Sequence, residues 1–408
     1  MAGGSLLGSL RPKFVARCAM IHRLAQIGHY GRILNLRTQL AQSKCSDPRD
    51  RIYGALNIIH GDDKKLGLRP DYSKTVAEVY HHTTVQWIKY YKRFDILSSC
   101  QLVKLSSDIP SWVPDWSVPL RCKLLWQPGL GDFWDLLVPF TFPADRTLQV
   151  FGVASATIRE VYDLSQLNPD MSSREYLGLL REILSCTSRA ISGELYRNSE
   201  TILEAICRTL VVNKFSDRFI PHRHTLHRFV DLIPVLEGLE GDILDLNTSS
   251  YQHLFFSTSP GRCFFTTKEG YIGMAPATAK PGDTVCNLLG SGKPMMLRPI
   301  TTEASNVYKL VGECFVHGLM AQEGILGEFP SGYRQIFYHD KEKHHDMIGY
   351  AHQDSDDIIK KDPRPIRLIV EKLREERIQN TGVLEPSSEE IVQIWRESSV
   401  DIKAFEII

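Results

Sequence analysis

The chain has 408 residues, of which 43% are hydrophobic and 24% are charged, the ordinary balance of a water-soluble globular protein with room for two or three domains. Lys and Arg together equal Asp and Glu at 48 each, so we expect no nucleic-acid partner and no attraction to acidic membranes. No apolar run approaches the roughly 18 to 20 residues that span a bilayer, and no membrane span is expected.

The cysteines indicate the compartment. There are nine, an odd number, at positions 18, 45, 100, 122, 186, 207, 263, 286 and 314, and none forms a CxxC pair. Scattered thiols in a long chain usually stay reduced and pack as small hydrophobes, so we expect a cytoplasmic protein. At the N-terminus, Arg11 and Lys13 follow the short apolar stretch instead of preceding it, which argues against a secretory signal.

Residues 1–107 are predicted to be a helical layer. Apolar residues at helical spacing favour two helices over 14–42. In "KCSDPRDRIYGALNII" (44–59), Ser46 or Asp47 is a suitable helix cap and Pro48 suits a first turn, so we predict a helix whose apolar half is buried. Another helix is expected from about Ser73 or Lys74 to position 91.

Residues 108–146 are predicted to be an irregular strap, because the three prolines of "DIPSWVPDWSVP" exclude helix. The strap is rich in large aromatic residues: Trp112, Trp116, Trp126, Phe133 and Trp134. Such a segment can wall an apolar cleft for a small molecule, although filling the core is the simpler role. We take Trp112, Trp116 and Trp134, with Tyr53, as candidate substrate-binding residues.

The remaining chain divides into three predicted parts. Residues 147–260 begin with a strand pair in "TLQVFGVASATIREVYDL" and continue as a mostly helical region. Residues 261–330 alternate short strands with Gly-containing turns, which favours a small β barrel or meander. Residues 331–408 begin with polar, loop-like sequence and end in charged helices. The predicted fold class is therefore α+β.

Four ordered stretches resemble the fungal heterokaryon-incompatibility (HET) family. They are "CSDPRDRIYGALNI", "LRPDYSKTVAEVY" leading to "IPSWVPDWS", "RCFFTTKEGYIGMAPATAKPGDTVCNLLGSGKPMMLRPI" and "YKLVGECFVHGLMAQE". The first is similar to the last block of the family's signature domain, and the last two are typical of its C-terminal region. Together they span roughly positions 40 to 325.

The resemblance also implies a difference from the family. Members usually begin with two earlier blocks, one like Y-x-A-L-S-Y-x-W-G and one containing C-I-N-Q, and neither occurs here. The signature domain is thought to resemble the TIR fold, so the absent blocks would supply its leading strands. We therefore expect an N-terminally shortened or divergent member, whose helical layer is the remnant of that domain or is completed by a partner.

Candidate catalytic residues are few. Glu313 and His317 lie two alternations apart on a strand-like run, where a Glu–His pair could transfer a proton. His81 lies beside His82 on a predicted helix, where a single hydrogen-bonding histidine is more common than a metal pair. The histidines of "PHRHTLH" (221–227) lack a neighbouring Cys, Asp or Glu to complete a zinc site. No nucleotide or hydrolase motif occurs, and neither a metal nor a cofactor is expected.

Three functions remain open. The leading hypothesis is a HET-like protein diverted to secondary metabolism as a cofactor-independent cyclase of the Diels–Alderase type, acting on a hydrophobic intermediate such as a terpenoid. Such catalysis needs mainly a shaped apolar cavity. The alternative is a non-enzymatic heterokaryon-incompatibility protein that regulates non-self recognition and cell death. A non-functional remnant is the third. The partner is accordingly a hydrophobic small molecule or another protein.

Overall fold

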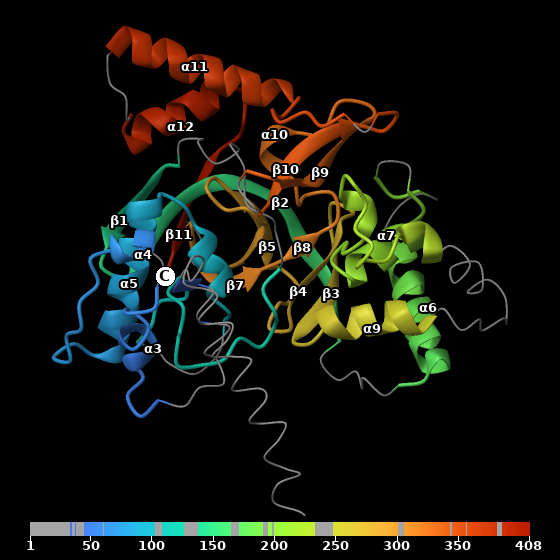
Figure 1. Ribbon diagram of the computed structural model, residues 1–408, viewed down its shortest axis with the longest axis horizontal. Coiled ribbons are helices and arrows are strands. Elements are labelled where there is room, and N and C mark those ends of the chain that lie inside the picture. The colour runs from blue at the N-terminus through green and yellow to red at the C-terminus, as the bar shows by residue number, and fades with distance from the viewer. Residues whose placement is uncertain are drawn as a thin grey trace, which may run out of the picture. The chain divides into compact units, whose positions relative to one another are not determined.

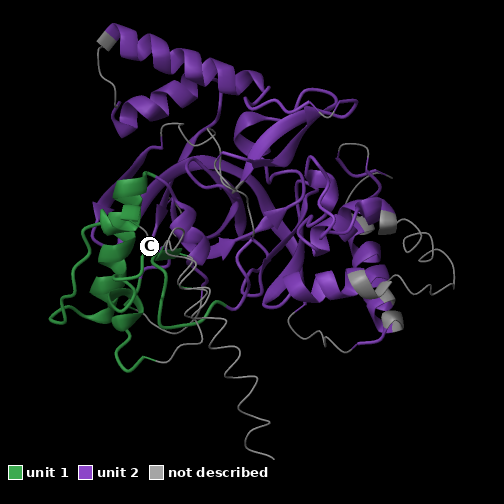
Figure 2. Cartoon of the chain, viewed as in Figure 1, with its two compact units in different colours: residues 1–92, 106–109, 113–120 green, residues 93–105, 110–112, 121–408 purple. Residues whose placement is uncertain are grey.

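The fold is α+β, as the sequence predicts. The computed structural model describes residues 45–59, 61–102, 108–125, 138–164, 171–190, 195–197, 200–232, 248–300, 306–342, 345–355, 357–381 and 386–408, with residues 33, 34 and 37. Contacts divide the chain into two units, shown in Figure 2. Unit 1 comprises residues 1–92, 106–109 and 113–120, and unit 2 comprises residues 93–105, 110–112 and 121–408.

Unit 1 is built from helices. It contains α3 (Asp50–Tyr53), α4 (Gly61–Lys64) and α5 (Val76–Tyr91). Helix α5 begins at a capping box in which Thr75 accepts from the Glu78 amide and the Glu78 side chain accepts from the Thr75 amide. Its buried face carries Trp87 and Ile88, and the helix ends where Lys92 takes the left-handed conformation. The helical N-terminal layer predicted from sequence is confirmed here for the described residues.

The helix predicted over 46–59 is shorter than expected. Only Asp50–Tyr53 is α-helical, and residues 54–59 form successive turns. Asp47 does not cap the helix: its carboxylate accepts the Arg49 amide at 2.9 Å and pairs with the Arg49 guanidinium at 2.7 Å. This local contact competes with a helical start, as short Asp side chains often do. The two helices predicted over 14–42 lie almost entirely outside the described residues.

Unit 2 contains a nine-stranded sheet (Figure 1). Its strands are β1 (Phe140–Ala144), β2 (Thr147–Asp163), β3 (Arg262–Thr267), β4 (Ile272–Pro276), β5 (Thr284–Leu288), β6 (Met295–Pro299), β7 (Val307–Glu313), β8 (Phe315–Val316) and β11 (Lys403–Ile407). The hydrogen-bonded order is β11-β7-β6-β5-β2-β3-β4-β8, and β1 pairs with β2 outside this path.

Part of this sheet returns on itself. Strand β11 pairs in parallel with β7 and antiparallel with β2, so β2, β5, β6, β7 and β11 form a ring of pairings. Strands β3, β4 and β8 extend the sheet from the second half of β2, and within the described residues no backbone pairing joins β8 back to the ring. The sheet as a whole is therefore an open one, and it includes the small β region predicted over 261–330.

The strand pair predicted over 147–164 is wrong, because these residues form one continuous strand of 17 residues. The first half of β2 pairs with β11 and β5, and the second half pairs with β3. Register shifts at Ala154–Ala156 and Ile158–Glu160 bend the strand between its two sets of partners, as β-bulges do. Gly152 lies where a Cβ would come within 2.3 Å of the Asn287 carbonyl oxygen, so this close pairing requires glycine.

Three helices pack beside β3 and β4. They are α6 (Ser173–Ala190), α7 (Ile202–Leu210) and α9 (Thr248–Thr258), and Figure 1 shows them together at one end of the sheet. Their buried faces share one core with the sheet, in which Ile183, Leu210 and Phe255 meet Phe264 and Met274. The helical runs predicted at "LLREILSCTSRAI" and "TILEAICRTLVV" are confirmed by α6 and α7.

The C-terminal part differs from the prediction in one element. Residues 333–352, predicted to be loop-like, form a hairpin of β9 (Tyr333–Asp340) and β10 (His345–His352) with eight paired positions. The sequence of this hairpin is polar because one of its faces is solvated. On the other face, Phe337, Ile348 and Tyr350 pack with Phe219. The charged helix is confirmed as α11 (Pro365–Thr381), which packs on α10 (Glu323–Leu326) and α12 (Ser388–Glu397).

Among the helices of the described residues, none combines the length and the apolarity that a membrane crossing requires. The domain boundaries at 107, 146, 260 and 330 stay a prediction, since the division into two units follows contacts and not these positions.

Candidate functional site

Glu313, a candidate acid, ends β7 and is almost fully buried at 2% exposure. Its carboxylate lies 2.8 Å from the Lys293 ammonium and 3.4 Å from the Arg262 guanidinium, and it also accepts the Leu125 amide. Arg262 in turn donates to the Lys123 carbonyl at 2.7 Å. One carboxylate thus joins β3, β7, the turn before β6 and the segment at 123–125, which is a structural role.

His317, its proposed partner, contacts a different carboxylate. The His317 Nε2 atom lies 2.6 Å from Glu200 Oε2, and the Tyr196 hydroxyl donates to the His317 carbonyl at 2.9 Å. Burial raises the pKa of Glu200, but the hydrogen bond from His317 and the charges of His317 and Arg208 outweigh it and lower the pKa below its ordinary value. The pair fastens the end of β8 to the start of α7.

The structure does not bring Glu313 and His317 together, because the strand-like run is interrupted. Gly312 has a φ of +147°, and the Cys314 amide donates to the Pro294 carbonyl between β7 and β8. Strand β8 then pairs with β4. The period-two spacing that places both side chains on one face therefore does not hold across this break.

The other candidates have separate surroundings. His81 lies on α5 in unit 1 and is partly buried. Tyr53 is 9% exposed, its hydroxyl donates to the Asp71 carbonyl at 3.1 Å, and its ring meets that of Tyr72 edge-on with centroids 5.3 Å apart. The Tyr53 side chain is therefore held by contacts within unit 1.

The two described tryptophans of the strap are also buried. Trp112, in unit 2, is 0% exposed; its indole donates to the Arg146 carbonyl at 3.1 Å and its ring lies 5.8 Å from that of Phe142. Trp116, in unit 1, is 5% exposed and lies 5.5 Å from the Arg37 guanidinium. Trp134 lies outside the described residues. The proposed role of these residues in substrate binding therefore stays a prediction.

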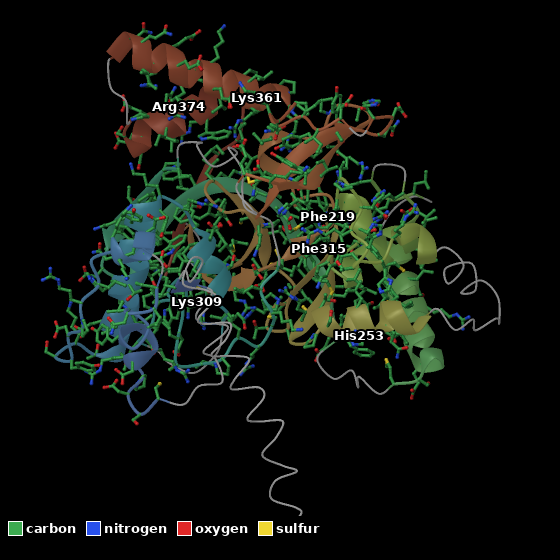
Figure 3. The ribbon with its side chains drawn as sticks, in the orientation of Figure 1. Phe219, His253, Lys309, Phe315, Lys361 and Arg374 are labelled. Atoms are coloured by element: carbon green, nitrogen blue, oxygen red, sulfur yellow. The ribbon has the colours of Figure 1, made fainter. Side chains whose placement is uncertain are left out.

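Sequence reasoning did not foresee an open pocket of about 520 Å³ in unit 2. Its lining comes from α7, η5 (Ser216–Arg218), the loop at 222–230 and the start of β9. The residues that line it are Thr201, Glu204, Arg208, Asp217, His222, Arg228, Phe229, Val230 and Arg334. Phe219, labelled in Figure 3, follows η5 and packs with Phe337 of β9 beside the pocket lining.

Contacts inside the lining fix its shape. The Arg208 guanidinium lies 3.1 Å from the Glu204 carboxylate and 4.0 Å from the centroid of the Phe229 ring. The Asp217 carboxylate accepts the Phe229 amide at 2.9 Å, and Arg334 donates to the Asp217 carbonyl at 2.7 Å. Arg208 is thus both paired and stacked, as buried arginines commonly are.

Two polar groups of the pocket lining make hydrogen bonds within the chain. Its hydroxyl group, Thr201, caps α7 by accepting the Glu204 amide at 3.1 Å, so its lone pair is engaged in a structural bond. His222 donates from Nδ1 to the Ser216 carbonyl at 3.1 Å, an assignment that follows because a carbonyl only accepts. Across the described residues, no three His, Cys, Asp or Glu side chains gather as metal ligands do. The sequence signal was present in "PHRHTLH", but its partners on α7 and β9 are distant in the chain.

Comparison with known proteins finds two matches. Residues 239–330 match the Het-6 beta-barrel domain. The chain is 24% identical over 349 residues to Heterokaryon incompatibility protein 6, OR allele, of Neurospora crassa, a match that covers 72% of this chain and 50% of that protein. The chain therefore spans about half the length of this curated relative, and no solved structure matches it. The chain is therefore similar to a fungal heterokaryon-incompatibility protein, and it contains a region that matches the Het-6 beta-barrel domain.

Proposed function

We propose that this protein acts in heterokaryon incompatibility as a non-enzymatic regulator, which recognises a partner in the cytoplasm of fused fungal cells and changes whether they die. One observation carries the proposal: the groups nominated for proton transfer are tied into the scaffold. Glu313 is held by Lys293 at 2.8 Å, and His317 is held by Glu200 at 2.6 Å. The similarity to a heterokaryon incompatibility protein over 72% of the chain supports the same role.

The same geometry gives less support to the cyclase hypothesis. A pericyclic catalyst needs an apolar cavity whose walls face the substrate. The residues proposed as such walls are buried: Tyr53, Trp112 and Trp116 are 9%, 0% and 5% exposed. Of the nine residues that line the described pocket, five are charged. Recognition by a preformed surface fits these observations better than cyclisation.

The proposal is tested by fusing hyphae of a filamentous fungus. One strain expresses this chain and the other carries either no copy or the Neurospora relative, and uptake of a membrane-impermeant dye counts dead fusion cells. We expect expression to change the fraction of dead cells in at least one pairing. An immunoblot confirms equal protein levels, and a Phe405→Asp variant, which buries a charge in the sheet, serves as the unfolded control.

Two results would count against this proposal. If the fraction of dead cells is the same with the folded protein, the unfolded control and the empty strain, the incompatibility role is wrong. Conversion of a hydrophobic polyene or terpenoid precursor by the purified protein would instead favour the cyclase.

A further inference from the structure

The pocket of unit 2 has an arginine-rich lining, and the comparisons with known proteins assign it no ligand. Three arginines, Arg208, Arg228 and Arg334, contribute to its lining together with His222. Guanidinium groups present flat, paired donors that match carboxylate and phosphate oxygens. A cavity of about 520 Å³ is within the usual size of small-molecule sites.

The lining holds three arginines against two acidic residues, Glu204 and Asp217, so one positive charge is in excess. Glu204 of α7 is paired with Arg208 at 3.1 Å, and Glu200, which precedes the capping residue of α7, lies 3.8 Å from the same guanidinium. Asp217 uses its carboxylate to accept the Phe229 amide. Arg334 keeps only one bond within the described residues, from Nη1 to the Asp217 carbonyl, which leaves Nε and Nη2 for a ligand.

A further cation lies directly behind the lining. Arg218, next to Asp217 in η5, donates to the Asn213 carbonyl at 3.3 Å and packs 4.3 Å from the centroid of Phe337. Within the described residues it has no carboxylate at ion-pair distance. Burial, and then the charge of Arg208, lower the pKa of Arg218 to about 10. A negative charge in the pocket would relieve this repulsion between like charges.

The pocket lining also includes an exposed apolar side chain, that of Val230. Val230 is 46% exposed, a high value for a valine, and it lines the same pocket. From this combination we propose that the pocket binds a single phosphate monoester carried on a small apolar body, with Arg334 donating hydrogen bonds to the phosphate oxygens and Val230 against the body.

The acidic residues set the limit of this specificity. Glu204 and Asp217 lie within the lining, where they repel a ligand that carries a row of phosphates. The whole chain has equal numbers of acidic and basic residues, so it provides no field that gathers polyanions. The site therefore selects one anionic group and rejects nucleic acid and heparin.

The experiment uses the full chain and phosphorus NMR. Phenyl phosphate is titrated with protein and its line width is followed; inorganic phosphate is the probe without an apolar body, and heparin is the polyanionic competitor. We expect phenyl phosphate to bind more tightly than inorganic phosphate, and heparin not to displace it at low ionic strength. Phenol, which lacks the anion, is tested by saturation transfer and is expected not to bind.

The variants locate the site. Arg334→Gln removes a charged donor from an exposed side chain, and we expect affinity for phenyl phosphate to fall about tenfold or more, the effect of one charge-assisted hydrogen bond. Arg396→Gln is the matched control, because Arg396 is an exposed arginine of unit 2 in the last turn of α12. Both variants should keep the wild-type thermal midpoint, since surface substitutions rarely alter stability.

Two results would overturn the proposal. One is that phenyl phosphate shows no saturable broadening, or binds no better than inorganic phosphate. The other is that Arg334→Gln and Arg396→Gln bind phenyl phosphate with the affinity of the wild type, which would place the anion elsewhere. Neither result bears on fusion-cell death, so the two proposals fail separately.

Discussion

Several charged residues of unit 2 serve the scaffold. Glu313 lies between Lys293 and Arg262, and Asp283 holds Arg298 at 2.8 Å. Arg262, Arg298 and Glu313 lie on three strands of one sheet, β3, β6 and β7. A buried ion pair adds little net stability over an apolar replacement, but removing one member leaves a charge without compensation. A single substitution at one of these residues should therefore lower the stability of unit 2.

Glu313→Gln is predicted to destabilise unit 2 strongly. The substitution keeps the shape but leaves Lys293 and Arg262 without their shared carboxylate, and breaking such a buried pair costs about 3–5 kcal/mol. Urea unfolding followed by tryptophan fluorescence measures the loss. Glu389→Gln, at an exposed position of α12, is the control and should change stability little. A loss below about 1 kcal/mol for Glu313→Gln would contradict the structural role.

The pair of Glu200 and His317 predicts a dependence on pH. Because the folded protein lowers the pKa of Glu200, this residue contributes stability above the carboxyl's ordinary pKa and loses it as the pH falls through the lowered value. The free energy of unfolding should therefore decline from about pH 4.5 downward. Glu200→Gln should decline less steeply in this range, as measured by urea titrations at several pH values. Parallel curves for the two proteins would contradict the assignment.

The partners of these residues were beyond the reach of sequence reasoning. Glu313 and His317 were predicted as a possible proton-transfer pair, but their contacts Lys293, Arg262 and Glu200 come from distant positions. A single sequence shows hydrophobic period and secondary-structure propensity. It does not show which distant elements come into contact when the chain folds. The pocket was missed for the same reason, since its lining combines α7, a loop and β9.

At the scale of elements, long amphipathic segments were predictable. The helices at 76–91, 173–190, 202–210 and 365–381 and the short strands between 262 and 316 follow from hydrophobic period. Three predictions failed where a local signal was misleading. The hairpin β9–β10 was not predicted because its sequence is polar. Strand β2 continues where a turn was expected. The apolar residues after Tyr53 form turns instead of helix.

The start of α5 provides a prediction at this scale. Thr75→Ala removes the side-chain oxygen that accepts the Glu78 amide, and loss of such a cap typically costs about 1 kcal/mol. Thermal unfolding followed by circular dichroism should show a lower midpoint, whereas Thr75→Ser should restore most of it because serine caps equally well. Equal midpoints for the alanine and serine variants would show that the capping box is dispensable.

At the scale of the whole molecule, unit 2 depends on a strand from the end of the chain. Strand β11 bridges β7 and β2, and the Ile408 carbonyl accepts the Ser111 amide at 3.1 Å. Hydrogen bonds thus join residues 297 positions apart. The C-terminal segment was predicted to belong to a separate polar and helical part. The five residues of β11 alternate only moderately between polar and apolar, and this pattern does not indicate which strands they pair with.

Phe405→Ala is predicted to weaken unit 2 as a whole. Phe405 is 2% exposed and packs edge-on against Tyr308 of β7 at 5.4 Å, so truncation leaves a cavity that costs about 3–5 kcal/mol. Lys403→Ala, on the same strand but exposed, is the matched control. Urea unfolding should separate the two variants clearly, and a similar small effect for both would mean that β11 is not part of the folded sheet.

The central claim is that the protein influences fusion-cell death by recognition and not by a reaction. The most direct measurement is the fraction of dead fusion cells produced by the wild type and by the double variant Glu200→Gln/His317→Gln, which retains a hydrogen bond but removes both titratable groups of this pair. The account predicts the same altered fraction for both proteins at equal levels. No change with the wild type, or a change that is lost in the double variant, would contradict it.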